Sequence, residues 1–472
     1  MKNGEITVTH VAQEKWSSGT AFLLAAIGSA VGLGNIYRFP YVVGENGGGA
    51  FVLLYLGIVA FFGIPLVMTE LTIGRRNQLP PISAFTALSQ GKKSQPFWKC
   101  IGWINVLTPL GILGFYFVIS GWTLNYVYSM ISGQLNNLVE GQTLKVFTDM
   151  QQSPLTLIFW MTISLSITAF VISRGVKLGL EKAVKILMPM LFLILVSLVI
   201  YSAFNGGMRE TFEFMFTPDF SKITGKTVLE AAGQAFFSLS LGSATMLVYG
   251  SYLPKSESIP KLACGVAFAD TFVALIAGFA IFPIVFTNGL ELDSGPNLVF
   301  VTFPIIFDQM PFGQLFGILF FLLLAFAAVT STISLFEPAV SNLEERGILT
   351  RGKGSLVVGL GLWCLAAVSA LSMNILSDVR LLTFSDTVAS KNIMDILEYM
   401  SANAMMLVNA LFAGIFVGWV MKRKDVLEEL GLDDSLLFKF WRVIIKVVVP
   451  VVISVLTLQL FELLDPLMAF IL

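Results

Sequence analysis

Long apolar stretches alternate with short polar ones along the whole 472-residue chain. A helix that crosses a membrane needs roughly 20 apolar residues. About eleven stretches meet this requirement, and they are centred near residues 31, 62, 113, 164, 192, 240, 273, 326, 364, 408 and 452. The pattern therefore predicts an all-α integral membrane protein with about 11 transmembrane helices.

Basic residues concentrate in every second loop. The loops after the even-numbered stretches are rich in Lys and Arg, namely Arg75, Arg76, Lys92, Lys93, Arg174, Lys177, Lys182, Lys185, Lys255, Lys261, Arg346, Arg351, Lys353, Lys422, Arg423 and Lys424. The other loops carry fewer, namely Lys145, Arg209, Lys222, Lys226, Arg380 and Lys391. By the positive-inside rule, the N-terminus is expected in the cytoplasm, and an odd number of spans puts the C-terminus outside.

Two apolar stretches are interrupted at their midpoints. The first contains GSAVGLG (28–34) and the sixth contains SLSLGSAT (238–245). Because the first and sixth stretches are five spans apart, the two corresponding helices cross the membrane in opposite directions. These matched breaks therefore predict two inverted five-helix repeats around a binding site in mid-membrane. Unwound backbone at that depth must be buried in protein or line a cavity. The alternative is that Gly and Ser only allow close helix packing, but the intramembrane residues Asn35, Arg38 and Asp270 favour a functional site.

The composition excludes several classes of protein. The chain is 56% hydrophobic and 12% charged, whereas about a quarter of the residues in soluble proteins are charged. A net charge of −1 argues against nucleic acid as a partner. Cys100, Cys264 and Cys364 lie far apart, and the single His10 rules out a zinc site built on histidines. The polar N-terminal segment does not resemble a cleavable signal peptide. An intramembrane enzyme would need a catalytic pair such as two aspartates. Asp270 has no evident second acid in the spans, so an intramembrane enzyme is not expected.

Five longer motifs make a family resemblance specific: GSAVGLGNIYRFPYVVGENGGGAF (28–51), PLVMTELTIGRR (65–76), SRGVKLGLEKAVKILMP (173–189), AAGQAFFSLSLG (231–242) and AVTSTISLFEP (328–338). The sequence resembles the neurotransmitter:sodium symporter family, in its bacterial sodium-dependent amino-acid transporter branch. The resemblance covers nearly the whole chain. It implies a multi-pass protein of the bacterial cytoplasmic (inner) membrane that works by alternating access.

The resemblance also implies a single transporter domain over residues 1–472. Within it, a cytoplasmic segment (1–18) precedes the first repeat (19–204), the second repeat (228–424) and an eleventh helix (437–465). By resemblance, the twelfth helix of many relatives is not expected here.

The implied substrate is an amino acid bound between the two breaks. By resemblance, its carboxylate meets the amides of Leu33 and Gly34, near Gly32, and the hydroxyl of Tyr116. Its ammonium meets carbonyls of Ala30, Phe237 and Ser238, with Ser240 close by. The side chain is enclosed by Ser29, Ile112, Phe237, Ser243, Ser331 and Leu335. Position 243 is bulky in leucine-selective relatives, so Ser243 predicts room for a larger, aromatic or long apolar side chain. A small aliphatic substrate is the alternative.

Two sodium sites are implied, because oxygen ligands suit a small hard cation. The first is expected to use the Ala30 carbonyl, Asn35, Ser238, Asp270 and the substrate carboxylate itself. Such a shared ligand makes sodium and substrate bind cooperatively. The second is expected to use Gly28, Val31, Ala327, Thr330 and Ser331. For Thr330 and Ser331 the alternative is hydrogen bonding to their own helix.

Asp270 also bears on chloride. By resemblance, a carboxylate near the first sodium site replaces the chloride of chloride-dependent relatives, and the other position that can carry it, Ala274, is neutral. Transport without chloride is therefore expected. Tyr55 and Gln234 would remain as polar support. The alternative is that Asp270 is a structural acid.

Gating residues are implied on both sides of the site. Outside it, Arg38 is expected to pair with Glu398, directly or through water, with Asp395 as the alternative acid. Inside it, Trp16 and Glu345 are retained, but Gln13 stands where the family has an arginine, and Lys15 is the possible substitute. Glu70 is expected to accept hydrogen bonds from the unwound sixth helix, or else to be an acid that reaches the cytoplasmic interface.

The predicted function is sodium-coupled import of neutral amino acids. A passive channel would need a continuous polar stripe, which these spans do not have. A family member that binds amino acids slowly, as a sensor, is the nearer alternative. The sequence leaves the choice between monomer and homodimer open, as well as the sodium stoichiometry and any proton antiport.

Overall fold

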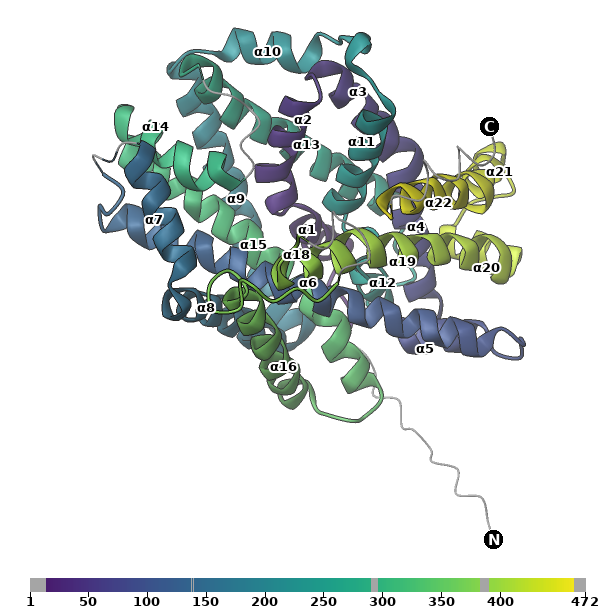
Figure 1. Cartoon of the computed structure of the whole chain (residues 1–472). Coiled ribbons are helices and arrows are strands. Elements are labelled where there is room, and N and C mark those ends of the chain that lie inside the picture. The colour runs from purple at the N-terminus through teal and green to yellow at the C-terminus, as the bar shows by residue number, and fades with distance from the viewer. Residues whose placement is uncertain (1–13, 137, 139, 290–295, 383–389, 462–472) are drawn as a thin grey trace.

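The computed structural model describes residues 14–136, 138, 140–289, 296–382 and 390–461. In these ranges all regular elements are helices, and they pack into one bundle around a continuous apolar core (Figure 1). The fold class predicted from the sequence is confirmed. Gln13 lies outside the described residues.

The first half of the chain begins with a broken span. It comprises α1 (Gly19–Ala30), the π-helical turn η1 (Gly34–Arg38) and α2 (Phe39–Glu45). The second span is α3 (Gly49–Ile58), η2 (Val59–Gly63) and α4 (Ile64–Asn77), and α5 (Pro81–Leu88) follows it. The next elements are α6 (Gln95–Ile131), α7 (Glu140–Gln152), α8 (Pro154–Ser173), η3 (Val176–Glu181) and α9 (Lys182–Phe204).

The second half begins with the short helices α10 (Met208–Phe216) and η4 (Phe220–Lys222). A second broken segment, α11 (Gly225–Ser238) and α12 (Thr245–Ser251), follows them. The chain continues with α13 (Ile259–Thr287), η5 (Leu298–Thr302), α14 (Phe303–Gln309), α15 (Gly313–Glu345) and α16 (Arg351–Leu371). The last elements are α18 (Ile393–Glu398), η6 (Tyr399–Met405), α19 (Met406–Ile415), η7 (Phe416–Val420), α20 (Arg423–Leu430), α21 (Leu436–Val443), η8 (Ile444–Val448) and α22 (Val449–Leu460).

Within the described residues, nine helices are long and apolar enough to cross a membrane, or ten if α1 and η1–α2 are counted as one bent span. The sixth expected span consists of two short helices, α11 and α12, because the residues between them are not helical. The exact number of eleven spans therefore stays a prediction, as does the inverted relation of the two halves.

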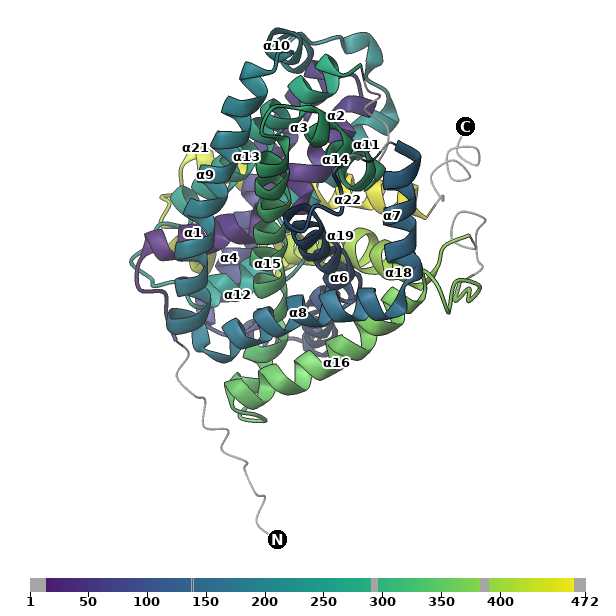
Figure 2. The same ribbon diagram turned by 90° about the vertical axis from the view of Figure 1, so that its left-hand side faces the viewer.

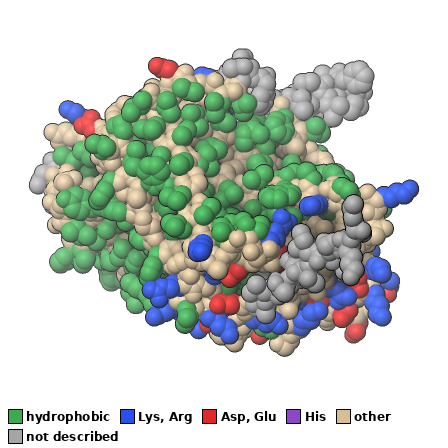
Figure 3. Space-filling model, turned by 90° about the horizontal axis from the view of Figure 1, so that it is seen from below, with side chains coloured by type: hydrophobic (Ala, Val, Ile, Leu, Met, Phe, Trp, Pro, Cys, Tyr) green, Lys and Arg blue, Asp and Glu red, His purple; other side chains and the backbone are tan. Residues whose placement is uncertain are grey.

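The longest helices, α6 and α15, pack against each other and pass through the middle of the molecule (Figures 1 and 2). Other helices carry large apolar side chains on the outside, such as Leu155 on α8 and Phe204 on α9. Figure 3 shows one face on which hydrophobic side chains spread widely while charged ones gather along one edge. Such a distribution suits a protein surrounded by lipid.

Candidate functional site

The break in the first span lies between α1 and η1. The helix ends at Ala30, Val31 takes an extended conformation (ψ 96°), and the two parts are bent by 52°. Gly32 lies within the break, where a Cβ atom would stand 2.6 Å from Ser331 Oγ. Glycine therefore allows this backbone to approach α15 closely.

The break in the sixth segment is longer. Between Ser238 and Thr245 the chain has positive φ angles at Ser240 (53°), Gly242 (75°) and Ala244 (65°). A Cβ atom on Gly242 would lie 2.0 Å from the Met406 carbonyl oxygen, so only glycine fits against α19 here. Left-handed backbone at Ser240 and Ala244 is unfavourable for non-glycine residues and is typical of functional loops.

Buried side chains hold the second break from two directions. Glu70 accepts a hydrogen bond from the Gly242 amide at 2.7 Å. Asn409 donates to the Gly242 carbonyl and to Thr108 Oγ1, both at 2.8 Å, and accepts from Asn105 Nδ2 at 3.0 Å. Both hydrogen-bonding groups of this unwound peptide are therefore satisfied by protein, as burial in a membrane protein requires.

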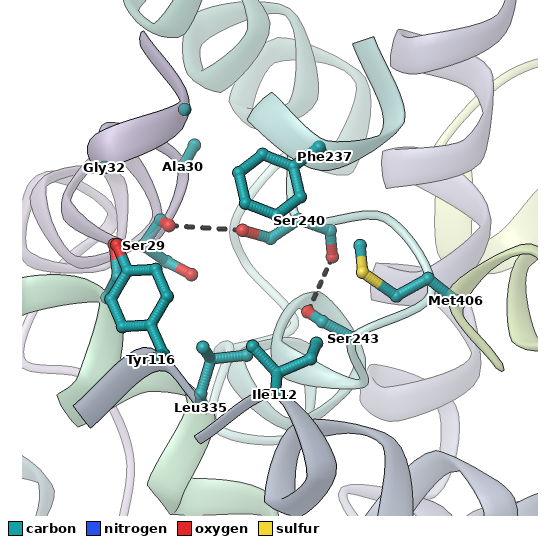
Figure 4. A pocket seen from close by; sticks show the side chains of 12 residues that line it. Ser29, Ala30, Gly32, Ile112, Tyr116, Phe237, Ser240, Ser243, Leu335 and Met406 are labelled. Carbon is teal, nitrogen blue, oxygen red and sulfur yellow. Dashed lines mark hydrogen bonds between the residues drawn. The ribbon is translucent and has the colours of Figure 1, made fainter. Parts of the chain in front are cut away.

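A cavity lies between the two breaks (Figure 4). We call it the pocket, and it is lined by Ser29, Ala30, Gly32, Gly34, Ile112, Tyr116, Phe237, Ser240, Ser243, Ser331, Leu335 and Met406. All of these except Met406 belong to the substrate-binding set expected from the sequence. Methionine on an apolar helix gives no signal that distinguishes a pocket residue from a core residue.

Both polar and apolar side chains line the pocket. Tyr116 OH accepts a hydrogen bond from the Leu33 amide at 3.4 Å, which places the hydroxyl at the first break. Ser240 Oγ donates to the Ser29 carbonyl at 3.2 Å, and Ser243 Oγ donates to the Ser240 carbonyl at 2.6 Å. Ser29 Oγ is buried without a hydrogen-bond partner. A small ligand that carries both polar and apolar groups matches this lining.

A buried carboxylate stands beside the pocket. Asp270 on α13 accepts hydrogen bonds from Asn35 Nδ2 at 2.7 Å, from Ser238 Oγ at 2.6 Å and from Tyr55 OH at 3.4 Å. Asn35 Oδ1 in turn accepts from the Gly32 amide at 3.2 Å. In the part of the chain that the structure describes, no Lys or Arg lies within 4.0 Å of Asp270. The charge of this carboxylate is therefore not balanced by a basic side chain.

Gln234 belongs to the same polar cluster, because its Nε2 donates to the Gly34 carbonyl at 2.9 Å. The structure thus brings Asn35, Ser238 and Asp270 together with Tyr55 and Gln234, as the resemblance implied. It also places Ala30 at the end of α1, on the wall of the pocket.

The residues expected at a second sodium site come from two packed helices, α1 and α15. Thr330 Oγ1 donates to the carbonyls of Phe326 and Ala327, both at 3.0 Å, which is the hydrogen bonding within one helix that the alternative interpretation described. Gly28 and Val31 are fully or nearly buried in the last turn and cap of α1. Their role as ligands stays a prediction.

A second cavity, which we call the vestibule, opens beyond the pocket. It is lined by Arg38, Lys226, Leu229, Glu230, Gly233, Phe236, Phe237, Ala402, Asn403, Met406, Leu407, Leu456, Gln459 and Leu460. The guanidinium of Arg38 lies over the Phe237 ring, 5.1 Å from its centroid. We call this end of the pocket the Arg38 side.

Arg38 and Glu398 interact electrostatically, but no ion pair within 4.0 Å joins them among the described residues. Asp395 lies in the first turn of α18, on the same helix as Glu398. A closed Arg38–Glu398 pair therefore stays a prediction for another conformation.

The opposite end of the pocket, which we call the Trp16 side, contains more polar contacts than the Arg38 side. Trp16 is buried, and its Nε1 donates to the Tyr249 carbonyl at 3.1 Å. Glu345 accepts a hydrogen bond from Ser83 Oγ at 2.7 Å. Lys15 is exposed.

An ion-pair network that the sequence did not predict lies on the Trp16 side. Arg351 pairs with Glu337 at 2.5 Å and with Glu344 at 3.0 Å, and it donates to the Ile172 carbonyl at 2.9 Å. Tyr252 OH donates to the same Glu337 at 2.5 Å. The signal for this network was Glu337 itself, an acid inside the apolar stretch SLFEP, since intramembrane acids have partners.

Comparison with known proteins decides the family. The model described as "Sodium:neurotransmitter symporter family" matches residues 13–138 and 138–469. The chain belongs to the sodium:neurotransmitter symporter family. This confirms the family predicted from the sequence.

Relatives and a solved structure agree with this family membership. A protein of Haemophilus influenzae, described as an "uncharacterized sodium-dependent transporter", is 36% identical over 95% of this chain and 98% of its own. The uncharacterized sodium-dependent transporter YhdH of Bacillus subtilis is 36% identical over 96% of this chain and 98% of its own. The crystal structure of MhsT in complex with L-phenylalanine is 39% identical, covers 95% of this chain and 100% of its own, and has a TM-score of 0.86. The relatives of this sodium:neurotransmitter symporter family member are transporters and not enzymes, as the sequence predicted.

Proposed function

We propose that the protein is a sodium-coupled symporter that imports neutral amino acids with hydrophobic or aromatic side chains. The observation that carries this proposal is the pocket between the two helix breaks, next to a buried carboxylate without a basic partner. An unbalanced buried charge is costly, so a bound cation at Asp270 would be stabilising. Because MhsT was solved with L-phenylalanine, an aromatic amino acid is the first ligand to test.

Each group of an amino acid would meet a suitable partner. The carboxylate would bind the amides of Leu33 and Gly34 at the first break, beside Tyr116. The ammonium would bind carbonyls at the end of α11. The side chain would lie between Ile112, Leu335 and Met406. The substrate carboxylate would also complete the first sodium site, which would couple ion and substrate.

Sodium would occupy two sites, and no chloride would be needed. The first site would be formed by Ala30, Asn35, Ser238 and Asp270, and the second by carbonyls and hydroxyls of α1 and α15. The carboxylate of Asp270 would supply the negative charge that chloride supplies elsewhere. Replacing chloride by gluconate should therefore leave uptake unchanged.

The proposed location is a bacterial inner membrane, with the N-terminus in the cytoplasm. In that orientation, the Arg38 side faces outward and the Trp16 side faces the cytoplasm. The vestibule would then admit substrate from outside, and transport would proceed by alternating access as the Trp16 side opens.

Uptake by the purified protein in liposomes tests the function. An inward sodium gradient should drive accumulation of L-phenylalanine, whereas an equal potassium gradient should not. Sodium-dependent thermal stabilisation by L-phenylalanine without accumulation would favour a slow amino-acid sensor instead. Neither stabilisation nor accumulation with any neutral amino acid would refute the proposal.

A further inference from the structure

The pocket and the vestibule are separated by two side chains. The linings of these cavities share Phe237, at the end of α11, and Met406, the first residue of α19. Phe237 supports the Arg38 guanidinium on its ring. Met406 is 3% exposed, and Figure 4 shows its side chain directed into the pocket, beside Ser243. A change at Met406 therefore alters both the size of the pocket and its separation from the vestibule.

The backbone of Met406 is held in place by the break in the sixth segment. Its carbonyl oxygen occupies the position next to Gly242 where any Cβ atom would clash. One turn later, Asn409 donates hydrogen bonds to the Gly242 carbonyl and to Thr108. Because the backbone is fixed in this way, the side chain of Met406 is the part of α19 that can adjust to a ligand.

The chemistry of methionine suits an adjustable wall. Its side chain is unbranched, has three rotatable bonds and carries a polarisable thioether that packs well on aromatic rings. The adjacent Ser243 is small and its hydroxyl donates a hydrogen bond to the Ser240 carbonyl, so it offers little apolar surface. Met406 therefore supplies apolar contact that Ser243 does not.

We propose that Met406 determines which side chains the pocket accepts and closes the pocket toward the vestibule. This inference rests on the proposed function, because it assumes that an amino acid occupies the pocket. An alanine at position 406 would connect the two cavities and favour an indole ring over smaller side chains. A phenylalanine would shorten the pocket and have the opposite effect.

Binding measurements on the purified full-length protein in sodium test this proposal. Competition experiments would give dissociation constants of L-alanine, L-phenylalanine and L-tryptophan for the wild type, Met406→Ala and Met406→Phe. In Met406→Ala, L-alanine and L-phenylalanine should bind about tenfold more weakly, since a hydrophobic pocket discriminates by ~1–3 kcal/mol per methylene. L-Tryptophan should change less than about threefold in this variant. In Met406→Phe, L-tryptophan should lose about tenfold, and L-alanine should be affected least.

The neighbouring Met405 provides a matched control, because it is partly buried and lines neither cavity. Met405→Ala should leave all three affinities unchanged. If both Met406 variants lose affinity equally for all three amino acids, or if the ratios of the three dissociation constants do not change, the proposal for Met406 is wrong. Sodium-dependent binding by the wild type would still support the proposed function in that case. If the wild type binds none of the three amino acids in sodium, the proposed function fails and this inference fails with it.

Discussion

On the Trp16 side of the pocket, ion pairs and hydrogen bonds join several helices, whereas on the Arg38 side two side chains separate the pocket from the vestibule. Arg351 connects α16 with α15 and with the end of α8. On the other side, Arg38 lies over Phe237 and forms no ion pair within 4.0 Å in the described part of the chain. The cavity volume is about 320 Å³ in the vestibule and about 30 Å³ in the pocket.

This difference indicates how the two sides would open. Opening the Trp16 side requires the separation of buried charges, which is unfavourable unless another interaction compensates for it. Opening the Arg38 side requires only that Phe237 and Met406 move. The conformation described here therefore has a closed Trp16 side, and Phe237 and Met406 separate its pocket from the vestibule. A ligand can shift the equilibrium between conformations with the Trp16 side closed and with it open only if it binds the two with different affinities.

The largest effect is expected from Arg351→Ala. The Glu337 carboxylate is fully buried, and removal of one partner from a buried ion pair costs ~3–5 kcal/mol. The substitution should therefore destabilise the conformation in which the Trp16 side is closed. Sodium-dependent binding of L-phenylalanine, measured by thermal stabilisation, should weaken by more than about tenfold for that reason.

A double variant separates the ion pair from general damage. In Arg351→Ala/Glu337→Gln the buried carboxylate is neutral, so part of the lost binding should return. Lys353→Ala, on the same turn of α16 and exposed, serves as the control. An Arg351→Ala variant that binds L-phenylalanine like the wild type would show that the Trp16 side is closed by other contacts.

The sequence predicted the framework of the site better than its closure. Glycine and serine in the middle of apolar stretches identified both breaks, because such residues are unfavourable in a helix unless a cavity or a close approach needs them. The neighbours of Asp270 followed from the family motifs. Arg351 was visible only as a basic loop residue, since its partners are 7 and 14 positions away and meet it only after folding. Met406 was missed because any apolar span contains methionines.

Asp270→Asn tests the region between the two sides, and its effect should be smaller than that of Arg351→Ala. Asp270 accepts three hydrogen bonds, one on Oδ1 and two on Oδ2. An asparagine keeps one carbonyl oxygen as an acceptor, so about one hydrogen bond to a charged group, ~1.5–3 kcal/mol, should be lost. In this variant, sodium should raise the unfolding temperature much less than it does in the wild type. Thermal unfolding in sodium and in potassium measures this difference, because damage to the fold alone lowers stability equally in both salts. A variant with undiminished sodium stabilisation would exclude Asp270 from the ion site.

Glu398→Gln should have a smaller effect in the present conformation. No ion pair within 4.0 Å joins this residue to Arg38, and the acid is exposed, so the free energy of unfolding should change by at most ~1 kcal/mol. If the pair forms when the Arg38 side closes, L-phenylalanine should dissociate faster from the variant. Asp395→Asn is the matched control from the same helix. Faster dissociation from that variant alone would identify Asp395 as the partner of Arg38.

Two serines provide the finest comparison between the sides. Ser17, on the Trp16 side, donates to Glu181 at 2.5 Å, whereas Ser29 Oγ is buried in the pocket wall without a partner. Ser17→Ala should lower the free energy of unfolding by about 0.5 kcal/mol, since the residue is exposed and a typical hydrogen bond contributes ~0.5–1.5 kcal/mol. Ser29→Ala removes no hydrogen bond and takes away a buried hydroxyl without a partner, so the free energy of unfolding should rise slightly while L-phenylalanine binding stays unchanged. Thermal unfolding with and without the ligand measures both effects. A Ser29→Ala variant with weaker L-phenylalanine binding would mean that this hydroxyl contacts the bound amino acid.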